Sequence, residues 1–393
     1  MPGEISLTTG RYLVLLEDDW TEASGELNRV AGIRAVDSAD AGLAAPLWES
    51  EGLVLRDIGV ALVSADPDQL TALTAAAEAP GPITLVEPER YVRAIGTPAT
   101  DPATDTVTGV DETTFTWGLQ AVRAPQSGAT GAGVRVAVLD TGLDLEHPDL
   151  TGRTITSQSF VEGEEAQDGH GHGTHCVGTS CGPRQPGNGP GYGVAYRAEI
   201  YAGKVLSNGG SGADGGILAG IAWAITNGCR VVSMSLGAGT QPGQPYSRTY
   251  ERVASRALSR GTLIVAAAGN ESERERGSVA PVGHPANCPS ILAVGAVDVR
   301  GAIADFSCGT VDTVGAVDVA GPGVDVYSSW PMPKRYRRIS GTSMATPHTA
   351  GVAALIAQAS GASGYELWAR LVQTARRLGL PSTDVGAGLV QAP

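Results

Sequence analysis

The sequence predicts an α/β protein in which helices flank a parallel β-sheet, preceded by a small α+β domain of ferredoxin-like order. Three observations lead to this fold class. From residue 114 to residue 393, short apolar runs alternate with helical stretches, a pattern typical of parallel sheets covered on both faces. Residues 1–95 instead predict the order strand–helix–strand–strand–helix–strand. Between these parts, residues 96–113 are rich in Thr, Pro, Asp and Gly, which indicates a linker.

The elements of the N-terminal part follow in order along the chain. RYLVLLED (11–18) predicts a strand, and TEASGELNRVAG (21–32) predicts a short amphipathic helix. The apolar stretch 52–66 predicts a strand, straight or bent. Asp66-Pro67 then opens a second helix, with the capping residue first and proline at the first helical position. ITLVEPERYVRAI (83–95) closes the domain as a strand, and its middle strands are the least defined.

In the second part, the clearest strands are the apolar runs VRVAVLD (134–140), RVVSMSLG (230–237) and TLIVAAAGN (262–270). Between them, GILAGIAWAITNG (216–228) and YERVASRALSRG (250–261) predict helices. Fully apolar strands of this kind are buried on both faces. We therefore expect one parallel sheet between two layers of helices.

Composition excludes several classes of protein. Apolar residues make up 42% of the 393 residues, too many for a disordered chain. No apolar run reaches the 18 or so residues of a membrane span, and a net charge of −14 disfavours nucleic acid as a partner. The start MPGEISLTTG lacks a secretion signal, so we expect a cytoplasmic protein if the chain is complete and a secreted one if a signal has been removed. Five cysteines predict no disulfide framework.

The negative charge is unevenly distributed. Residues 1–112 carry 20 acidic and 6 basic residues, whereas residues 113–393 carry 21 of each sign. A basic run, KRYRR (334–338), precedes the segment that contains Ser343. One hypothesis is that the acidic N-terminal domain docks on this basic run; the alternative is that the acidity only keeps the chain soluble.

Two reactive side chains stand where the backbone turns. Asp140 ends the strand VRVAVLD before a Thr-Gly turn, a place that a simple turn-forming aspartate would also take. In GHGHGTHCVGT, His172 lies between glycines ahead of a predicted helix. Three histidines within six residues could bind a metal. The acidic or thiol ligands and the H-x-x-x-H spacing of zinc proteases are missing, however, so we expect no metal there.

A third reactive side chain, Ser343, lies at the start of the apolar helix in ISGTSMATPHTAGVAALIAQA. Thr342 or Ser343 could simply cap that helix. A serine at a helix N-terminus is also surrounded by backbone N–H groups and the positive end of the helix dipole. This environment suits a developing oxyanion.

The order Asp140, His172, Ser343, within VLDTG, HGTHCVGT and GTSMATPHTAG, resembles the subtilisin-like serine proteases over roughly residues 115–393. The resemblance implies that Ser343 is the nucleophile, His172 the general base and then acid, and Asp140 the residue that orients the imidazole. Asn270, at the end of AAAGN, would be the oxyanion-hole side chain, although a turn asparagine would have the same place.

The resemblance also implies how a polypeptide substrate is bound, as an added antiparallel strand. The backbone-binding segments would be Gly209, Gly210, Ser211 and Gly212 on one side and Ser235, Leu236 and Gly237 on the other. The pocket for P1, the residue before the cleaved bond, would include Ala268, Gly269 and Gly283, with Glu271 at its rim. Asp214 stands where many relatives carry an aromatic residue beside P4, which argues against a strong apolar preference there.

We expect no required cofactor. Asp149 in HPDL matches a calcium ligand of the family, but the loop PRQPGNGPGYG (183–193) has no carboxylate to complete that site. Asp298 could serve a weaker cation site or be a structural surface residue. Cys176 resembles the thiol of the proteinase K branch, and a small buried group beneath His172 would explain it equally.

The sequence therefore predicts a serine endopeptidase made as a zymogen. Residues 1–95 resemble the family's inhibitory propeptide, 96–113 form the linker and 114–393 the peptidase domain. Its partners would be a polypeptide substrate and its own N-terminal domain, and it would act as a monomer. Two other readings stay open: a peptide-binding pseudoenzyme with a permanent lid, and a maturation protease dedicated to one intracellular precursor.

Overall fold

The computed structural model describes residues 8–17, 23–38, 49–95 and 109–393. Most of the predicted linker 96–113 lies outside these described residues. In the described part, all five cysteines are buried free thiols. No helix of this part has both the length and the hydropathy needed to cross a bilayer.

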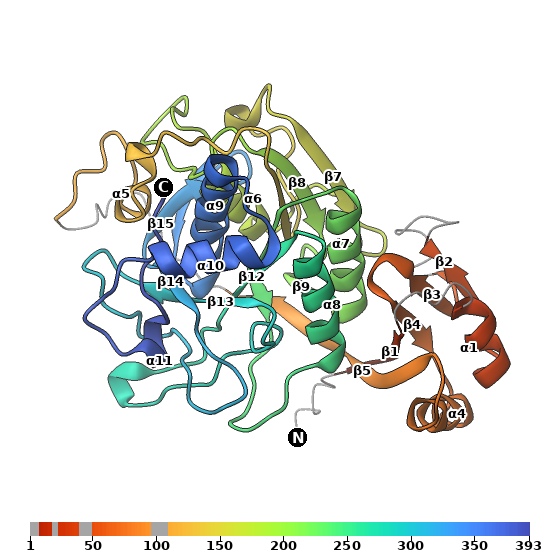
Figure 1. Cartoon of the computed structure of the whole chain (residues 1–393). Helices are drawn as coiled ribbons and strands as arrows, with labels where there is room; N and C mark the ends of the chain where they lie inside the picture. Colours follow the sequence, from red (N-terminus) through yellow and green to blue (C-terminus); the bar gives the residue numbers. More distant parts are fainter. Residues whose placement is uncertain (1–7, 18–22, 39–48, 96–108) are drawn as a thin grey trace, which may run out of the picture.

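A parallel sheet forms the centre of the larger part of the molecule (Figure 1). Every neighbouring pair of its strands is parallel, as expected for strands buried on both faces. Within the described residues the strand order is β14 (Val319–Pro322), β13 (Leu292–Val297), β12 (Leu263–Ala267), β10 (Val231–Met234), β6 (Arg135–Asp140), β8 (Glu199–Lys204) and β7 (Ile155–Ser159).

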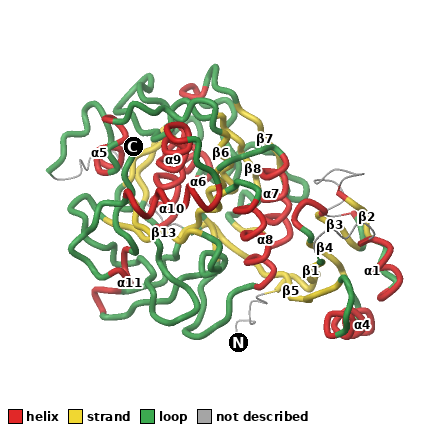
Figure 2. Tube along the Cα trace, viewed as in Figure 1, coloured by secondary structure: helices red, strands yellow, loops and turns green. Residues whose placement is uncertain are grey.

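Helices cover both faces of this sheet (Figure 2). Successive side chains of a strand point to opposite faces. Accordingly, Val136 and Val138 of β6 join the cluster under α6 (His172–Cys181) and α9 (Thr342–Ser360). Ala137 and Leu139 join the cluster under α7 (Asp214–Thr226) and α8 (Arg248–Ser259).

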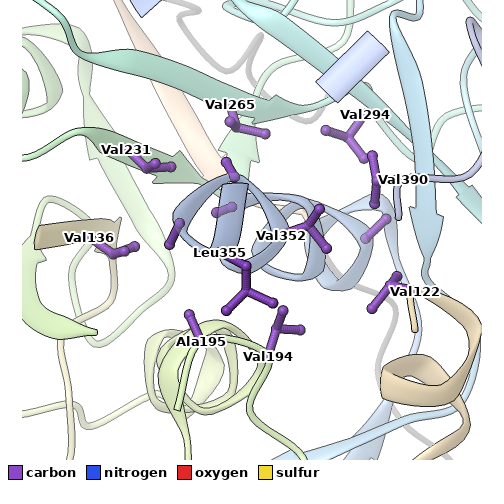
Figure 3. Packing of buried hydrophobic residues seen from close by; sticks show 14 of the residues in the cluster. Val122, Val136, Val194, Ala195, Val231, Val265, Val294, Val352, Leu355 and Val390 are labelled. Atoms are coloured by element: carbon purple, nitrogen blue, oxygen red, sulfur yellow. The ribbon is translucent and has the colours of Figure 1, made fainter. Parts of the chain in front are cut away.

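Helix α9 passes through the middle of the first of these clusters (Figure 3). Its Val352 and Leu355 pack between the valines of the sheet and the segment that contains Val194 and Ala195. These side chains are almost completely buried. The helix that carries Ser343 is therefore fixed on all sides by apolar contacts.

Shorter elements complete the larger part. They are α5 (Trp117–Ala121), β9 (Ser211–Ala213), β11 (Leu236–Gly237), the hairpin β15 (Val326–Ser329) with β16 (Tyr336–Ile339), α10 (Gly364–Thr374), α11 (Ser382–Val385) and the 3₁₀ turns Ala124–Gln126, Pro148–Leu150 and Arg274–Arg276.

The N-terminal residues form a separate α+β unit with the sheet order β5-β1-β4-β3-β2. All of its strand pairs are antiparallel except β2 with β3. Its elements are β1 (Thr8–Leu16), α1 (Ala23–Ala31), β2 (Ala35–Asp37), β3 (Gly52–Leu55), the 3₁₀ turn Arg56–Ile58, β4 (Val60–Ser64), α4 (Pro67–Glu78) and β5 (Ile83–Ala94). The order β5-β1-β4-β3 is that of a ferredoxin-like sandwich.

Two details of this unit test the sequence reading. The single strand expected at 52–66 is wrong: the chain forms the hairpin β3–β4, because Gly59 adopts φ +64° and reverses its direction. The expected start of α4 is confirmed. The Asp66 carboxylate accepts hydrogen bonds from the backbone N–H groups of Asp68 and Gln69, and the Gln69 side chain accepts one from Asp66 N–H.

Both faces of the N-terminal sheet are buried. Val14 and Leu16 of β1 pack beneath α1 and α4. Leu13 and Leu15 point the opposite way and share a cluster with residues of α7 and α8. The N-terminal unit thus uses one sheet face for its own core and the other to contact the larger part, beside which it lies in Figure 1.

Candidate active site

The reactive side chains meet at the carboxyl edge of the parallel sheet. Asp140 is the last residue of β6, and Asn270 follows the end of β12 by three residues. His172 is the first residue of α6, and Ser343 is the second residue of α9. The loops beyond the carboxyl ends of parallel strands are the usual place for a binding site in such sheets.

Asp140 and His172 form a buried pair. His172 Nδ1–H donates to Asp140 Oδ1 at 2.7 Å, and the N–H of Thr141 donates to the same oxygen at 2.7 Å. Burial alone would lower the pKa of His172, but the Asp140 carboxylate outweighs it and holds that pKa well above its usual value. In the described residues, Nε2 has no hydrogen-bond partner. Nε2 is therefore free to exchange a proton with a group that binds beside Ser343.

Sequence reasoning missed Asp168, which holds the start of α6 in place. Its Oδ1 accepts hydrogen bonds from His170 N–H, Gly171 N–H and the Thr141 hydroxyl. Its Oδ2 accepts from the N–H and hydroxyl of Thr174. An acidic residue just ahead of a predicted helix is the sequence signal for such a cap. This signal does not predict the second contact of Asp168, with Thr141 in the turn after Asp140.

Ser343 is buried against a segment of the N-terminal unit. Its Oγ contacts the carbonyl oxygen of Ile95 and lies 3.1 Å from the carbonyl oxygen of Ser235. The carbonyl of Ser343 in turn accepts the Ser235 hydroxyl at 2.8 Å. The hydroxyl that sequence analysis selects therefore faces the carbonyl of residue 95 of the same chain.

The amide of Asn270 has a defined orientation. Its Oδ1 accepts hydrogen bonds from the N–H (2.9 Å) and the hydroxyl (2.8 Å) of Thr342. Its Nδ2 is buried and, in the described residues, has no partner. Because both acceptor contacts are made by Oδ1, the NH₂ group is left to donate to an oxygen that binds beside Ser343.

Residues 91–95 lie as an extra antiparallel strand between β9 and β11. Tyr91, Val92 and Arg93 pair with Ala213, Gly212 and Ser211. On the opposite side, Ala94 and Arg93 pair with Leu236 and Gly237. Further hydrogen bonds run from Ala94 N–H to Gly210 O at 2.9 Å and from Ile95 N–H to Ser235 O at 3.3 Å.

The two predicted backbone-binding segments therefore both touch this strand. Gly209 is the exception, since its N–H donates to Ser207 Oγ within its own turn. The groove thus binds the main chain of residues 91–95, and main-chain binding of this kind tolerates many sequences.

The predicted P1 pocket lies beside Ile95, whose Cδ1 is next to Gly237. Gly283 N–H donates to Ala268 O at 2.8 Å, which ties two of the expected walls together. A Cβ on Gly269, where φ is +118°, would meet Glu271 Oε2 at 2.5 Å. The Cys308 thiol, which sequence reasoning did not select, donates to that same carboxylate oxygen at 3.1 Å.

Residue 92 has apolar surroundings, although the position of Asp214 in the sequence argued against a strong apolar preference at P4. Val92 is 1% exposed and shares an apolar cluster with Leu206, Ile217 and Leu236. The Asp214 carboxylate accepts hydrogen bonds from Tyr250, which is itself a member of that cluster, and from His284.

The residues around Asp149 do not fit a calcium ion. Arg335 Nη2 lies 2.7 Å from Asp149 Oδ1, while the hydroxyls of Tyr192 (2.9 Å) and Tyr336 (2.8 Å) donate to Oδ2. Both carboxylate oxygens are therefore bound by protein donors, and Arg335 also lies next to Gly187 of the loop 183–193.

The carboxylate of Asp298 accepts hydrogen bonds from the backbone N–H groups of Arg300 and Ala302, as a structural aspartate does.

Cys176 lies beneath the Asp140–His172 pair. Its sulfur is 3.8 Å from His172 Nδ1 and donates to the Ser343 carbonyl at 3.6 Å. Burial raises the pKa of the thiol, so it stays protonated at neutral pH. This geometry agrees with a small packing group rather than a reactive thiolate.

The hypothesis that the acidic N-terminal domain docks on the run 334–338 stays a prediction, but three arginines of the run have partners outside the unit 8–95. Arg335 pairs with Asp149, Arg338 pairs with Glu112, and Arg337 stacks on Trp330 at 4.6 Å. None of these partners belongs to the unit 8–95.

The N-terminal unit uses other polar contacts. The carboxylate of Glu87 accepts hydrogen bonds at the start of α8, from the N–H groups of Arg248 and Thr249 and from the Ser247 hydroxyl. Glu89 accepts the N–H of Gly215 at the start of α7. Both carboxylates thus occupy helix N-termini, where a negative charge is stabilised.

A nucleophile-bearing helix start, a buried Asp–His pair and a groove that binds an extended main chain define a serine protease. Comparison with known proteins agrees: the model of the subtilase family (Peptidase_S8) matches residues 131–389. The chain belongs to the subtilase family. It is 44% identical over 283 residues to subtilisin Savinase of Lederbergia lenta, covering 70% of this chain and 96% of that protein. It is 41% identical over 284 residues to subtilisin E of Bacillus subtilis strain 168, covering 70% of this chain and 69% of that protein.

Proposed function

We propose that the chain hydrolyses peptide bonds with Ser343, His172 and Asp140 and is made as a zymogen that its own residues 1–95 inhibit. The observation that carries this proposal is the contact between Ser343 Oγ and the Ile95 carbonyl oxygen, with residues 91–95 held as a strand in the groove. Every group of the site comes from one chain, which is consistent with a monomeric protease.

In the proposed reaction, His172 Nε2 takes the proton of Ser343 as its oxygen attacks the carbonyl carbon of the P1 residue. Asp140 accepts the Nδ1–H throughout and stabilises the imidazolium. The developing oxyanion receives hydrogen bonds from Asn270 Nδ2 and from the Ser343 backbone N–H. His172 then donates its proton to the leaving amine, the acyl-enzyme forms on Ser343, and a water molecule activated by His172 releases the acid.

Maturation is expected to begin with a cut between Ile95 and Gly96, at the first bond of the predicted linker. The reason is that the carbonyl of residue 95 is the one in contact with Ser343 Oγ. N-terminal sequencing of the purified chain after incubation should give a new terminus, GTPATD. The same incubation of Ser343→Ala should leave the chain intact.

Two further observations decide between a self-cut and a contaminating protease. A cut within one molecule proceeds at a rate that does not change with protein concentration. A first cut at any bond other than 95–96, or equal cutting of Ser343→Ala, would overturn the proposed maturation. A wild-type chain that neither cuts itself nor hydrolyses casein would favour a peptide-binding protein.

We also propose that the chain needs no calcium at Asp149, because the Arg335 guanidinium supplies the positive charge there. Burial by itself would raise the pKa of Asp149, but Arg335 and the two tyrosine hydroxyls outweigh it and lower that pKa. Thermal melting of the Ser343→Ala chain, which cannot digest itself, should therefore give the same Tm in calcium and in EDTA.

Arg335→Ala in that background should lower Tm, because it leaves the buried Asp149 carboxylate without its cation. Arg300→Ala is the matched control, since Arg300 pairs with Asp298 at an exposed site and should cost about 0–1 kcal/mol. If EDTA lowers Tm and Asp149→Asn abolishes that effect, calcium is bound at Asp149 and the proposal fails.

A further inference from the structure

A buried polar cluster that the chemistry does not use lies at the far end of the groove. Asp214 begins α7, Tyr250 belongs to α8, and His284 precedes Pro285 in the loop after Gly283. All three side chains are at most 2% exposed. Asp214 Oδ1 accepts the Tyr250 hydroxyl at 3.0 Å and His284 Nε2–H at 3.1 Å.

The second oxygen of Asp214 binds the strand in the groove. In that strand, alternate residues turn their backbone groups toward β9. Ala94 N–H donates to Gly210 O, and Val92 pairs with Gly212. The next in this series is Arg90, opposite residue 214, where the chain has already turned into α7. There Asp214 Oδ2 accepts Arg90 N–H at 3.0 Å. The Asp214 carboxylate thus takes the place that a backbone carbonyl of β9 would have, one position after β9 ends.

The side chain of residue 90 reaches the same cluster. His284 Nε2–H is used on the Asp214 carboxylate, which leaves Nδ1 as an acceptor. Arg90 Nη1 lies 3.4 Å from this Nδ1. The ring of His284 is held by a T-shaped contact with Tyr250 at 4.8 Å between centroids. His284 Nδ1, an acceptor whose ring is bound on its other side by the Asp214 carboxylate, therefore faces the Arg90 guanidinium.

We propose that Asp214 and His284 form a subsite for P6, the sixth residue before the cleaved bond, which binds its backbone N–H and prefers Arg or Lys. This inference rests on the proposed function, because it numbers positions from a cut after Ile95. The site binds Arg90, two residues before Val92 in the strand, so recognition of the substrate extends from P4 to P6. Asp214 and His284 are specificity-determining residues here and take no part in bond cleavage.

Quenched fluorescent peptides based on the chain's own sequence test the subsite with the self-processed wild-type enzyme. The parent peptide is ERYVRAI–GT, in which arginine is P6. Three variants replace this arginine by citrulline, by glutamate or by arginine methylated on its backbone nitrogen (the N-methyl peptide). A shorter peptide, YVRAI–GT, lacks P6. Mass spectrometry confirms cleavage after isoleucine. Removing the P6 N–H should lower kcat/KM about tenfold, through KM and not kcat, because a hydrogen bond to a charged acceptor is lost.

Variant enzymes separate recognition from simple packing. In Asp214→Ala, the peptides with and without the P6 backbone N–H should be cleaved equally. In His284→Phe, which keeps a ring against Tyr250, the preference for arginine over citrulline and glutamate should disappear. Asp298→Ala removes a carboxylate that closes an exposed turn and should leave every ratio as in the wild type.

The outcomes distinguish the two levels of the proposal. If no peptide is cleaved, the short one included, the proposed function itself fails. If the short peptide is cleaved but the wild type does not distinguish the N-methyl, citrulline and glutamate peptides from the parent, the P6 subsite is wrong and the cluster only ties α7 and α8 together. The wild-type series decides this even if Asp214→Ala does not fold.

Discussion

Replacing Ser343 by alanine should slow the chemical step by about 10⁶-fold, the size of loss measured when subtilisin itself loses its nucleophile or its histidine. His172→Ala should have an effect of the same order, because the two groups act as a unit. The convenient readout is cleavage of the chain's own 95–96 bond. Since residues 91–95 already fill the groove, this is a single-turnover reaction whose first-order rate constant contains no KM term.

His175→Ala is the control for the choice of base. His175 lies in the same helix, but its Nε2 donates to the carbonyl of Val326 at 3.0 Å, and burial lowers its pKa to about 3. This imidazole stays neutral and is committed to the backbone. If the folded His175→Ala chain were as slow as His172→Ala, the assignment of the general base would be wrong.

Asn270→Ala should slow self-cleavage by about 10²–10³-fold, a range established by removing the corresponding kind of donor in subtilisin. The reason is that Nδ2 would donate to the oxyanion but has no ground-state partner in the described residues, so its hydrogen bond is made only as charge develops. The Tm of this variant should change little, because Thr342 keeps other contacts, such as the hydrogen bond that its hydroxyl accepts from Gly269 N–H.

Asn227→Ala serves as the comparison for this variant. Asn227 caps the end of α7, and its side chain donates to the carbonyl of Trp223. Its removal should leave the rate of self-cleavage unchanged. A rate for Asn270→Ala within a few-fold of wild type would exclude a direct role in stabilising the oxyanion.

The reactive residues could be selected from the sequence because each lies in a short motif that also fixes the local backbone. Asp140 ends an apolar strand, and Ser343 begins an apolar helix; both features depend on near neighbours. The alternation of apolar strands and helices likewise predicts the parallel sheet, since burial on both faces demands it.

Contacts between distant segments could not be predicted in the same way. Nothing near Arg335 in the sequence indicates that Asp149, far earlier in the chain, is its partner, so the basic run looked free for docking. Asp214 was expected at P4 because of its position in the chain, whereas its carboxylate is turned toward His284. The hairpin at Gly59 was missed because the stretch 52–66 is apolar throughout its strands and has only a short turn between them.

The strand β5 belongs to two structures at once: it is an edge of the N-terminal sheet and also the strand that fills the groove. A cut after Ile95 breaks none of the hydrogen bonds of this strand, so the severed fragment stays in place as long as it stays folded. Its own core is small, built around residues such as Val14, Leu27 and Leu73. Such a core gives the fragment only marginal independent stability, and docking is linked to its folding by mass action. In the proposed maturation, the unfolding rate of this fragment would therefore set the delay before the first foreign peptide can enter the groove. Substitutions in the core of the fragment, far from Ser343, would change that delay.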